Sequence, residues 1–187
     1  MNVAVKTYAS SATTKLSAHF NANEFKCKCG KAHNFLISVE LIEMLEKLYA
    51  ALNCSKIIVN SGYRCSAHDK AVGGNGSGQH TKGTAADIVC YGQDGKVISS
   101  KQVCCKAQDL GFTGIANITK AYTSTHVDVR TGSRWYGDET KGNNTVTSDF
   151  YSYFGIAKPT PQTPAKQTKQ VTLTIDGATW KGTLTKE

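Results

Sequence analysis

The chain of 187 residues has no long apolar run and only three prolines. No apolar run approaches the ~20 residues that a membrane-spanning helix needs, so we expect no membrane partner. The N-terminal residues lack both the charged start and the long apolar core of a secretory signal peptide. We therefore expect synthesis in the cytoplasm without a signal peptide.

Acidic residues are also scarce. The 14 Asp and Glu are outnumbered by 22 Lys and Arg, which gives a formal net charge of +8 and an isoelectric point near 9.1. Such a charge favours an anionic partner, although ordinary solubility charge is an equally good interpretation. The chain has no basic helix, arginine-rich run or basic strand studded with aromatic residues, so we expect no nucleic-acid partner.

Cysteine, in contrast, is plentiful. The chain has seven cysteines, an odd number, so at least one is unpaired or pairs between chains. Together with the missing signal peptide, this indicates a reducing compartment. Cys27 and Cys29, followed by His33, suggest a zinc knuckle, but Cys-x-Cys is tighter than the usual ligand spacing and a second pair is absent. Reduced cysteines in a tight turn are the favoured interpretation, and structural zinc is the alternative.

The apolar pattern predicts both helices and strands. Residues 36–53 follow the period of an amphipathic helix, and Ser38 is a suitable N-cap. The β-branched run at 57–61 predicts a buried strand, and 85–91 predicts another. A second helix is expected at 100–110. These elements predict an α+β fold with a mostly antiparallel sheet, flanked by helices that pack away from the functional cleft.

The last part of the chain differs in composition from the rest. Residues 1–155 are expected to form the main domain, and 156–170, which hold all the prolines with Thr, Gln and Lys, a linker. Residues 171–187 alternate apolar and polar around Asp176-Gly177, which predicts a β-hairpin. Because two strands alone are marginally stable, the hairpin should dock on the main domain or on another copy of itself. The sequence leaves the oligomeric state open.

Three residues predict a metal site. His80 and Asp87 lie seven positions apart with small residues between them, as in a turn that leads into a strand. His126 lies in a later stretch whose alternation predicts a strand. Two imidazoles and one carboxylate from these elements would form a three-ligand zinc site with an open fourth position, which is typical of catalytic zinc.

The pattern of these residues resembles that of a known protein family. Ser-Gly-Tyr-Arg at 61–64, then His80 and Asp87 in a His-x-x-Gly-x-Ala-x-Asp pattern, then His126-x-Asp128 resemble the zinc D-Ala-D-Ala carboxypeptidase and peptidoglycan endopeptidase family, peptidase family M15. The resemblance covers roughly residues 15–137. It implies the fold shared by these peptidases and the hedgehog signalling domain, with Zn²⁺ as cofactor. It also implies a peptidase that cuts peptide bonds of peptidoglycan stem peptides or cross-links.

The resemblance also implies roles for side chains around the zinc. The matching Arg lies in the family's active site, so Arg64 is a candidate catalytic and substrate-binding residue, with a structural salt bridge as the alternative. Tyr63 beside it is a second candidate substrate-binding residue. Relatives often carry Ser two residues before His80. Here Gly78 holds that position, and Ser77, one residue earlier, is the candidate for the substrate contact.

The residue expected to accept a proton from the zinc-bound water differs from the one that several members of this family use. Several relatives carry Glu or Asp three residues before the third ligand, where this chain has Thr123. Asp128, two residues beyond His126 on the same strand face, is the nearest available carboxylate and the candidate general base. The alternative is that Asp128 orients a histidine ligand.

Two functional interpretations follow. The first is a carboxypeptidase or endopeptidase that acts on peptidoglycan at the bacterial cell wall. A wall-cutting enzyme without a signal peptide resembles a phage endolysin. The second is a non-catalytic, zinc-stabilised wall-binding module, which the absence of an acidic residue at Thr123 favours.

Overall fold

The computed structural model describes residues 4–142, 144–160 and 168–185. The chain divides into two compact units, Met1–Ile156 and Ala157–Glu187, and each is described by itself. Residues 161–167 of the linker expected at 156–170 lie outside the described residues.

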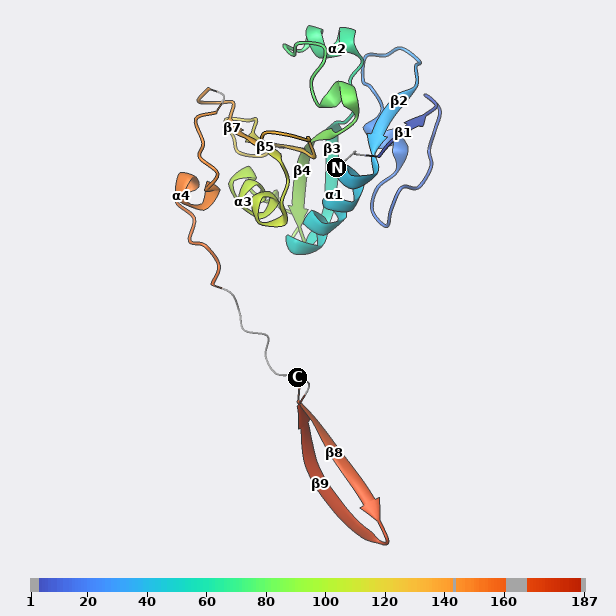
Figure 1. The fold of residues 1–187 in the computed structure, drawn as a ribbon, viewed down its shortest axis with the longest axis vertical. Coiled ribbons are helices and arrows are strands. Elements are labelled where there is room, and N and C mark those ends of the chain that lie inside the picture. Colours follow the sequence, from blue (N-terminus) through green and yellow to red (C-terminus); the bar gives the residue numbers. More distant parts are fainter. Residues whose placement is uncertain (1–3, 143, 161–167, 186–187) are drawn as a thin grey trace. The chain divides into compact units, whose positions relative to one another are not determined.

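A five-stranded sheet forms the centre of the first unit (Figure 1). Its strand order is β3-β4-β6-β5-β7, and three of the four neighbouring pairs are antiparallel while β5 and β7 are parallel. The α+β fold with a mostly antiparallel sheet is thus confirmed. The strands are β3 (Cys54–Ser61), β4 (Ala85–Gly92), β5 (Gly114–Asn117), β6 (Thr125–Asp128) and β7 (Trp135–Asp138).

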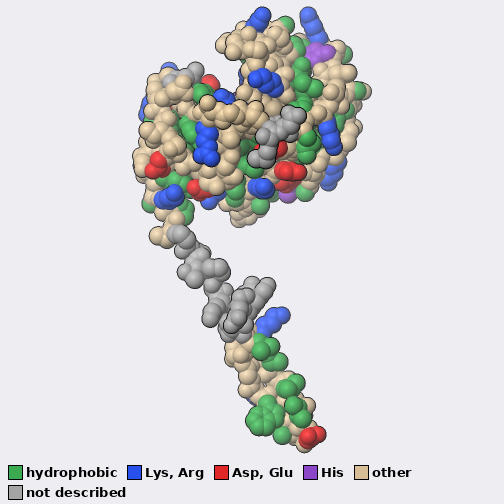
Figure 2. Space-filling view, in the orientation of Figure 1, with side chains coloured by type: hydrophobic (Ala, Val, Ile, Leu, Met, Phe, Trp, Pro, Cys, Tyr) green, Lys and Arg blue, Asp and Glu red, His purple; other side chains and the backbone are tan. Residues whose placement is uncertain are grey.

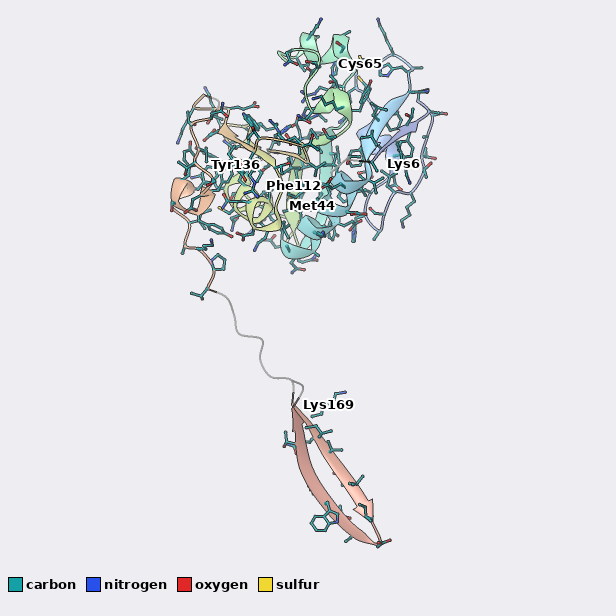
Figure 3. All side chains as sticks on the ribbon, viewed as in Figure 1. Lys6, Met44, Cys65, Phe112, Tyr136 and Lys169 are labelled. Atoms are coloured by element: carbon teal, nitrogen blue, oxygen red, sulfur yellow. The ribbon has the colours of Figure 1, made fainter. Side chains whose placement is uncertain are left out.

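Two helices pack together and against this sheet. Helix α1 (Val39–Ala51) contacts β3, and α3 (Ser100–Leu110) contacts β5 and β6. Ser38 caps α1 as expected, because its Oγ accepts a hydrogen bond from Leu41 N at 3.2 Å. The core between helices and sheet includes Met44 and Phe112, both labelled in Figure 3.

Smaller elements complete the first unit. Strands β1 (Val5–Tyr8) and β2 (Phe35–Ser38) form an antiparallel pair. Leu36 and Ile37, which fit the helical pattern, therefore lie in a strand. They pair with Thr7 and Lys6, residues far away in the sequence that no local pattern could connect to them. The remaining elements are η1 (Ala22–Phe25), α2 (Ser66–Ala71), η2 (His80–Lys82) and α4 (Phe150–Phe154).

The second unit contains an antiparallel hairpin, β8 (Thr168–Ile175) and β9 (Ala178–Thr185). Asp176 and Gly177 both have positive φ, which is the turn geometry that the Asp-Gly pair predicts. One face of the hairpin is apolar and exposed, with Trp180 paired to Leu173 (Figure 2). The predicted C-terminal hairpin is confirmed, while its docking and any association through it stay predictions.

Two surface features bear on the partners that we expect. None of the described helices is long and apolar enough to span a membrane. On the face of the first unit in Figure 2, Lys and Arg side chains are scattered and do not gather into one basic patch.

We predict that a chain without residues 157–187 keeps the fold of the first unit. The buried residues of the core all lie at or before Tyr151, and Ile156 packs against them, so the core is complete without the hairpin. The melting temperature should shift by less than ~3 °C, the size of a 1 kcal/mol effect in a domain of this length. Calorimetry on both chains measures this, and a truncated chain that fails to fold would place the boundary elsewhere.

Candidate active site

The site begins with a cross-strand pair on the central sheet. Asp87 on β4 lies directly opposite His126 on β6, so their side chains leave the same face of the sheet. The Asp87 Oδ1 and His126 Nδ1 atoms are 3.0 Å apart. The next residues along, Ile88 and Val127, point into the core on the other face. The strand alternation therefore separates core side chains from site side chains.

His80 reaches the same point from η2, the short helix before β4. Its Nδ1 lies 2.7 Å from the carbonyl oxygen of Gly62, which can only accept, so Nδ1 carries the ring proton. The other nitrogen, Nε2, lies 3.3 Å from Asp87 Oδ1 and 3.2 Å from His126 Nδ1. The structure thus brings the three expected ligands together.

A carboxylate on the far side of His126 fixes the second imidazole. Asp128 Oδ2 lies 3.0 Å from His126 Nε2 and accepts a hydrogen bond from it, so Nδ1 is the ring nitrogen that faces His80 and Asp87 and could bind a metal. Asp128 is completely buried, and its oxygens also accept from the Arg130 backbone N at 3.0 Å and from the Arg130 guanidinium. A Cβ on Gly114 would lie 2.0 Å from Asp128 Oδ2, so only glycine leaves room for this carboxylate.

These donor atoms fit a zinc ion. His80 Nε2 and His126 Nδ1 face each other at 3.2 Å, beside the Asp87 carboxylate. A cation placed between them would be bound by both nitrogens and by the carboxylate. All three atoms lie within 4.8 Å of one another and belong to buried residues. Two nitrogens and one oxygen are a common donor set for zinc.

The electrostatics of the site also favour a cation. Burial alone would raise the pKa of Asp87, but hydrogen bonds from His126 and His80 outweigh it and hold the pKa well below its usual range. Burial alone would lower the pKa of His126, but the Asp128 and Asp87 carboxylates raise it to about 9. Two carboxylates therefore concentrate negative charge around one imidazole.

Arg64 joins the site from the segment that follows β3. Its Nη2 lies 2.5 Å from Asp87 Oδ2, its Nη1 3.4 Å from Asp69 Oδ1, and its Nε donates to Ser61 Oγ at 2.8 Å. These contacts correspond to the salt-bridge alternative for Arg64. They use three of the five N–H donors of the guanidinium and leave two for another acceptor.

A pocket of about 300 Å³ opens over these residues. The Trp135 ring lies edge to face with the His126 ring at 5.6 Å, and the Arg130 guanidinium stacks over Trp135 at 5.1 Å. Glu139, an exposed residue just after β7, also lines the pocket. No motif marks Glu139 in the sequence, because the parallel pairing of β5 and β7 brings it to this position.

The two remaining candidate residues lie elsewhere. Among the described residues that line the pocket, neither Tyr63 nor Ser77 is found. Tyr63 packs edge to face against His33, with ring centroids 6.1 Å apart. Ser77 donates its backbone N–H and its hydroxyl to Asn75 Oδ1, at 2.8 and 3.1 Å. Their roles toward a substrate stay predictions.

The comparison with known families agrees with this geometry. A family model described as Peptidase M15 matches residues 18–128, which is more than half of the chain. The match extends from just before η1 to the last residue of β6, so it contains all three candidate ligands. No curated protein matches the chain.

We predict that His80→Ala and His126→Ala each abolish one equivalent of bound zinc, because either change removes one of three ligand atoms. Metal analysis of the purified proteins measures the loss. His19→Ala is the matched control, since His19 lies on the surface against Glu46 and Tyr49 and should leave the zinc content unchanged. Full occupancy in both site variants would contradict the assignment.

Proposed function

Because the chain belongs to peptidase family M15, we propose that it is a zinc-dependent peptidase that hydrolyses peptide bonds in the stem peptides of bacterial peptidoglycan. The observation that carries this proposal is the convergence of His80 Nε2, Asp87 Oδ1 and His126 Nδ1 beneath an open pocket. Three protein ligands leave a position for water or substrate, as in catalytic zinc sites. Carboxypeptidase and endopeptidase cleavage are both compatible with this pocket.

Different residues have different roles at this site. Zinc bound here would act as a Lewis acid, which lowers the pKa of a bound water to ~7 and polarises a carbonyl group. Gly62 O holds His80 through Nδ1, and Asp128 holds His126 through Nε2, so both imidazoles keep a fixed tautomer and orientation. Arg64 fixes the Asp87 carboxylate through Oδ2 and leaves Oδ1 facing the histidines.

The two guanidinium groups that line the pocket suit an acidic peptide. Arg64 and Arg130 each present N–H donors beside the ligands, and stem peptides carry free carboxylates. The net charge of +8 adds a long-range attraction to anionic polymers of the wall. We therefore propose peptidoglycan as the partner and the bacterial cell wall as the place of action.

The proton acceptor of this proposal is Glu139, and Asp128 is a positioning residue. Asp128 is fully buried and accepts from both His126 and Arg130, which lowers its pKa to about 2 against the raising effect of burial. A carboxylate so enclosed is a poor proton acceptor. Glu139 is exposed and lines the pocket, so a proton taken up there can pass on to solvent.

The alternative function is a zinc-stabilised wall-binding module without turnover. The observation that favours it is Thr123, which occupies the position of the usual base and bonds only to Thr119 in the described contacts, at 3.3 Å between hydroxyl oxygens. A binding module would retain the wall polymer and release no fragment.

Digestion of purified peptidoglycan separates the two functions. We predict zinc-dependent release of new amino groups, because hydrolysis of each peptide bond frees one, and mass spectrometry of the fragments identifies the bond. His126→Ala should release none, since it lacks a ligand. A wild-type protein that binds the wall with full zinc and frees no amino group would favour the binding module.

Two isosteric variants separate the roles of the carboxylates. Glu139→Gln should keep zinc and lower kcat by ~10²–10⁴-fold, the size of a general-base contribution. Asp128→Asn should instead weaken zinc affinity by ~10–100-fold, because His126 loses the acceptor that orients it. Turnover at saturating zinc distinguishes them, since excess metal rescues only the second defect. The reverse pattern would make Asp128 the base.

A further inference from the structure

A second group of ligand-type side chains lies apart from the first. Cys27, Cys29 and His33 belong to the loop between η1 and β2, and Cys65 lies immediately before α2. Figure 3 labels Cys65. One ligand atom from each residue lies within 4.8 Å of the other three, and none of the four belongs to the group of His80.

The distances match those of a tetrahedral metal site. Ligand atoms about 2.0–2.3 Å from a tetrahedral zinc lie roughly 3.3–3.8 Å from one another. Here Cys29 Sγ and His33 Nε2 are 3.1 Å apart, and the whole group stays within 4.8 Å. All seven cysteines of the chain are free thiols in the structure, so no disulfide competes for these sulfurs.

Three of the four ligands are also oriented by the surrounding backbone. His33 Nδ1 lies 3.1 Å from the Asn34 carbonyl oxygen and so carries the ring proton, which leaves the Nε2 lone pair toward Cys29. Backbone N–H groups donate to two of the sulfurs, from Cys65 N to Cys27 Sγ at 3.3 Å and from His68 N to Cys65 Sγ at 3.4 Å. Such bonds stabilise thiolates.

We propose that Cys27, Cys29, His33 and Cys65 bind a second Zn²⁺ ion, which is structural. Three sulfurs and one imidazole nitrogen are a soft, tetrahedral donor set that selects zinc over calcium or magnesium. Four protein ligands complete the coordination shell and leave no position for water or substrate. This closed set contrasts with the three ligands beneath the open pocket.

The second zinc would secure the segment that holds the active site. The loop has little apolar surface to bury, since Lys26, Lys28 and Lys31 are all exposed. Lys28 Nζ donates to Asn60 O at 2.6 Å, which ties the loop to the end of β3. Just before the loop, Phe25 O accepts from Tyr63 N at 2.8 Å.

A metal that joins this loop to Cys65 would clamp residues 62–65 at both ends. Within that segment, Gly62 O holds His80 at 2.7 Å and Arg64 holds Asp87 at 2.5 Å. The second zinc is therefore inferred to position two ligands of the first. It takes no part in the chemistry of the pocket.

Cobalt substitution of the full chain tests the proposal without relying on activity. Co²⁺ bound by thiolates gives an intense sulfur-to-metal charge-transfer absorption, which a site of two His and one Asp cannot give. We expect this band in the wild type and in His126→Ala, because the latter keeps all four sulfur-site ligands. We expect zinc analysis to give two equivalents in the wild type and one in His126→Ala.

Variants of single cysteines localise the site. Cys29→Ala should lose the charge-transfer band and one zinc equivalent, whereas Cys105→Ala, a cysteine in α3 outside the group, should keep both. If Cys29→Ala does not fold, the charge-transfer band and the zinc content of the wild type and His126→Ala still test the proposal. A wild type purified under reducing conditions that gives no charge-transfer band, or that shows a disulfide among these cysteines, would overturn the proposal.

Discussion

The register between β4 and β6 is the constraint on which the site depends. It sets Asp87 opposite His126 and Ala85 opposite Asp128, so two of the candidate ligands and Asp128 share one face. A slip of one residue would send these side chains into the core and expose Ile88 and its neighbours. The apolar face packed against α1 and α3 therefore holds the active-site face in place, and folding energy and site geometry come from the same strands.

A second constraint is the short segment after β3, which passes very close to η1. A Cβ on Gly62 would lie 2.6 Å from Phe25 Cα, so the close approach requires glycine. The approach lets the Gly62 carbonyl reach His80, and it brings Arg64 to Asp87. Two of the three candidate ligands thus depend on four residues of irregular chain. The proposed sulfur site lies at the end of this segment, at Cys65.

The sequence predicts what is local and leaves out what depends on distant pairing. His80, Asp87 and His126 could be found because strand alternation and a dense motif mark them. Cys65 could not be joined to Cys27 and Cys29, since 36 or more residues separate them and the two segments meet only through tertiary contacts such as the Phe25–Tyr63 backbone bond.

The same reason explains the other differences. The helical pattern of residues 36–53 includes Leu36, which belongs to β2, because pairing with β1 overrides a helical period. Glu139 carries no signal, since its position depends on β7 joining the sheet in parallel beside β5.

The role of Asp128 shows why spacing alone leaves alternatives open. Two residues beyond His126 on the same strand face, it fits a base and a positioning residue equally well. What separates the roles is enclosure: Gly114 removes the side chain that would displace the carboxylate, and Arg130 neutralises it. A group that holds an imidazole by its far nitrogen must stay ionised and fixed, whereas a base must take up and release a proton. One buried carboxylate cannot do both well, so the enzyme proposed here needs a second, exposed carboxylate.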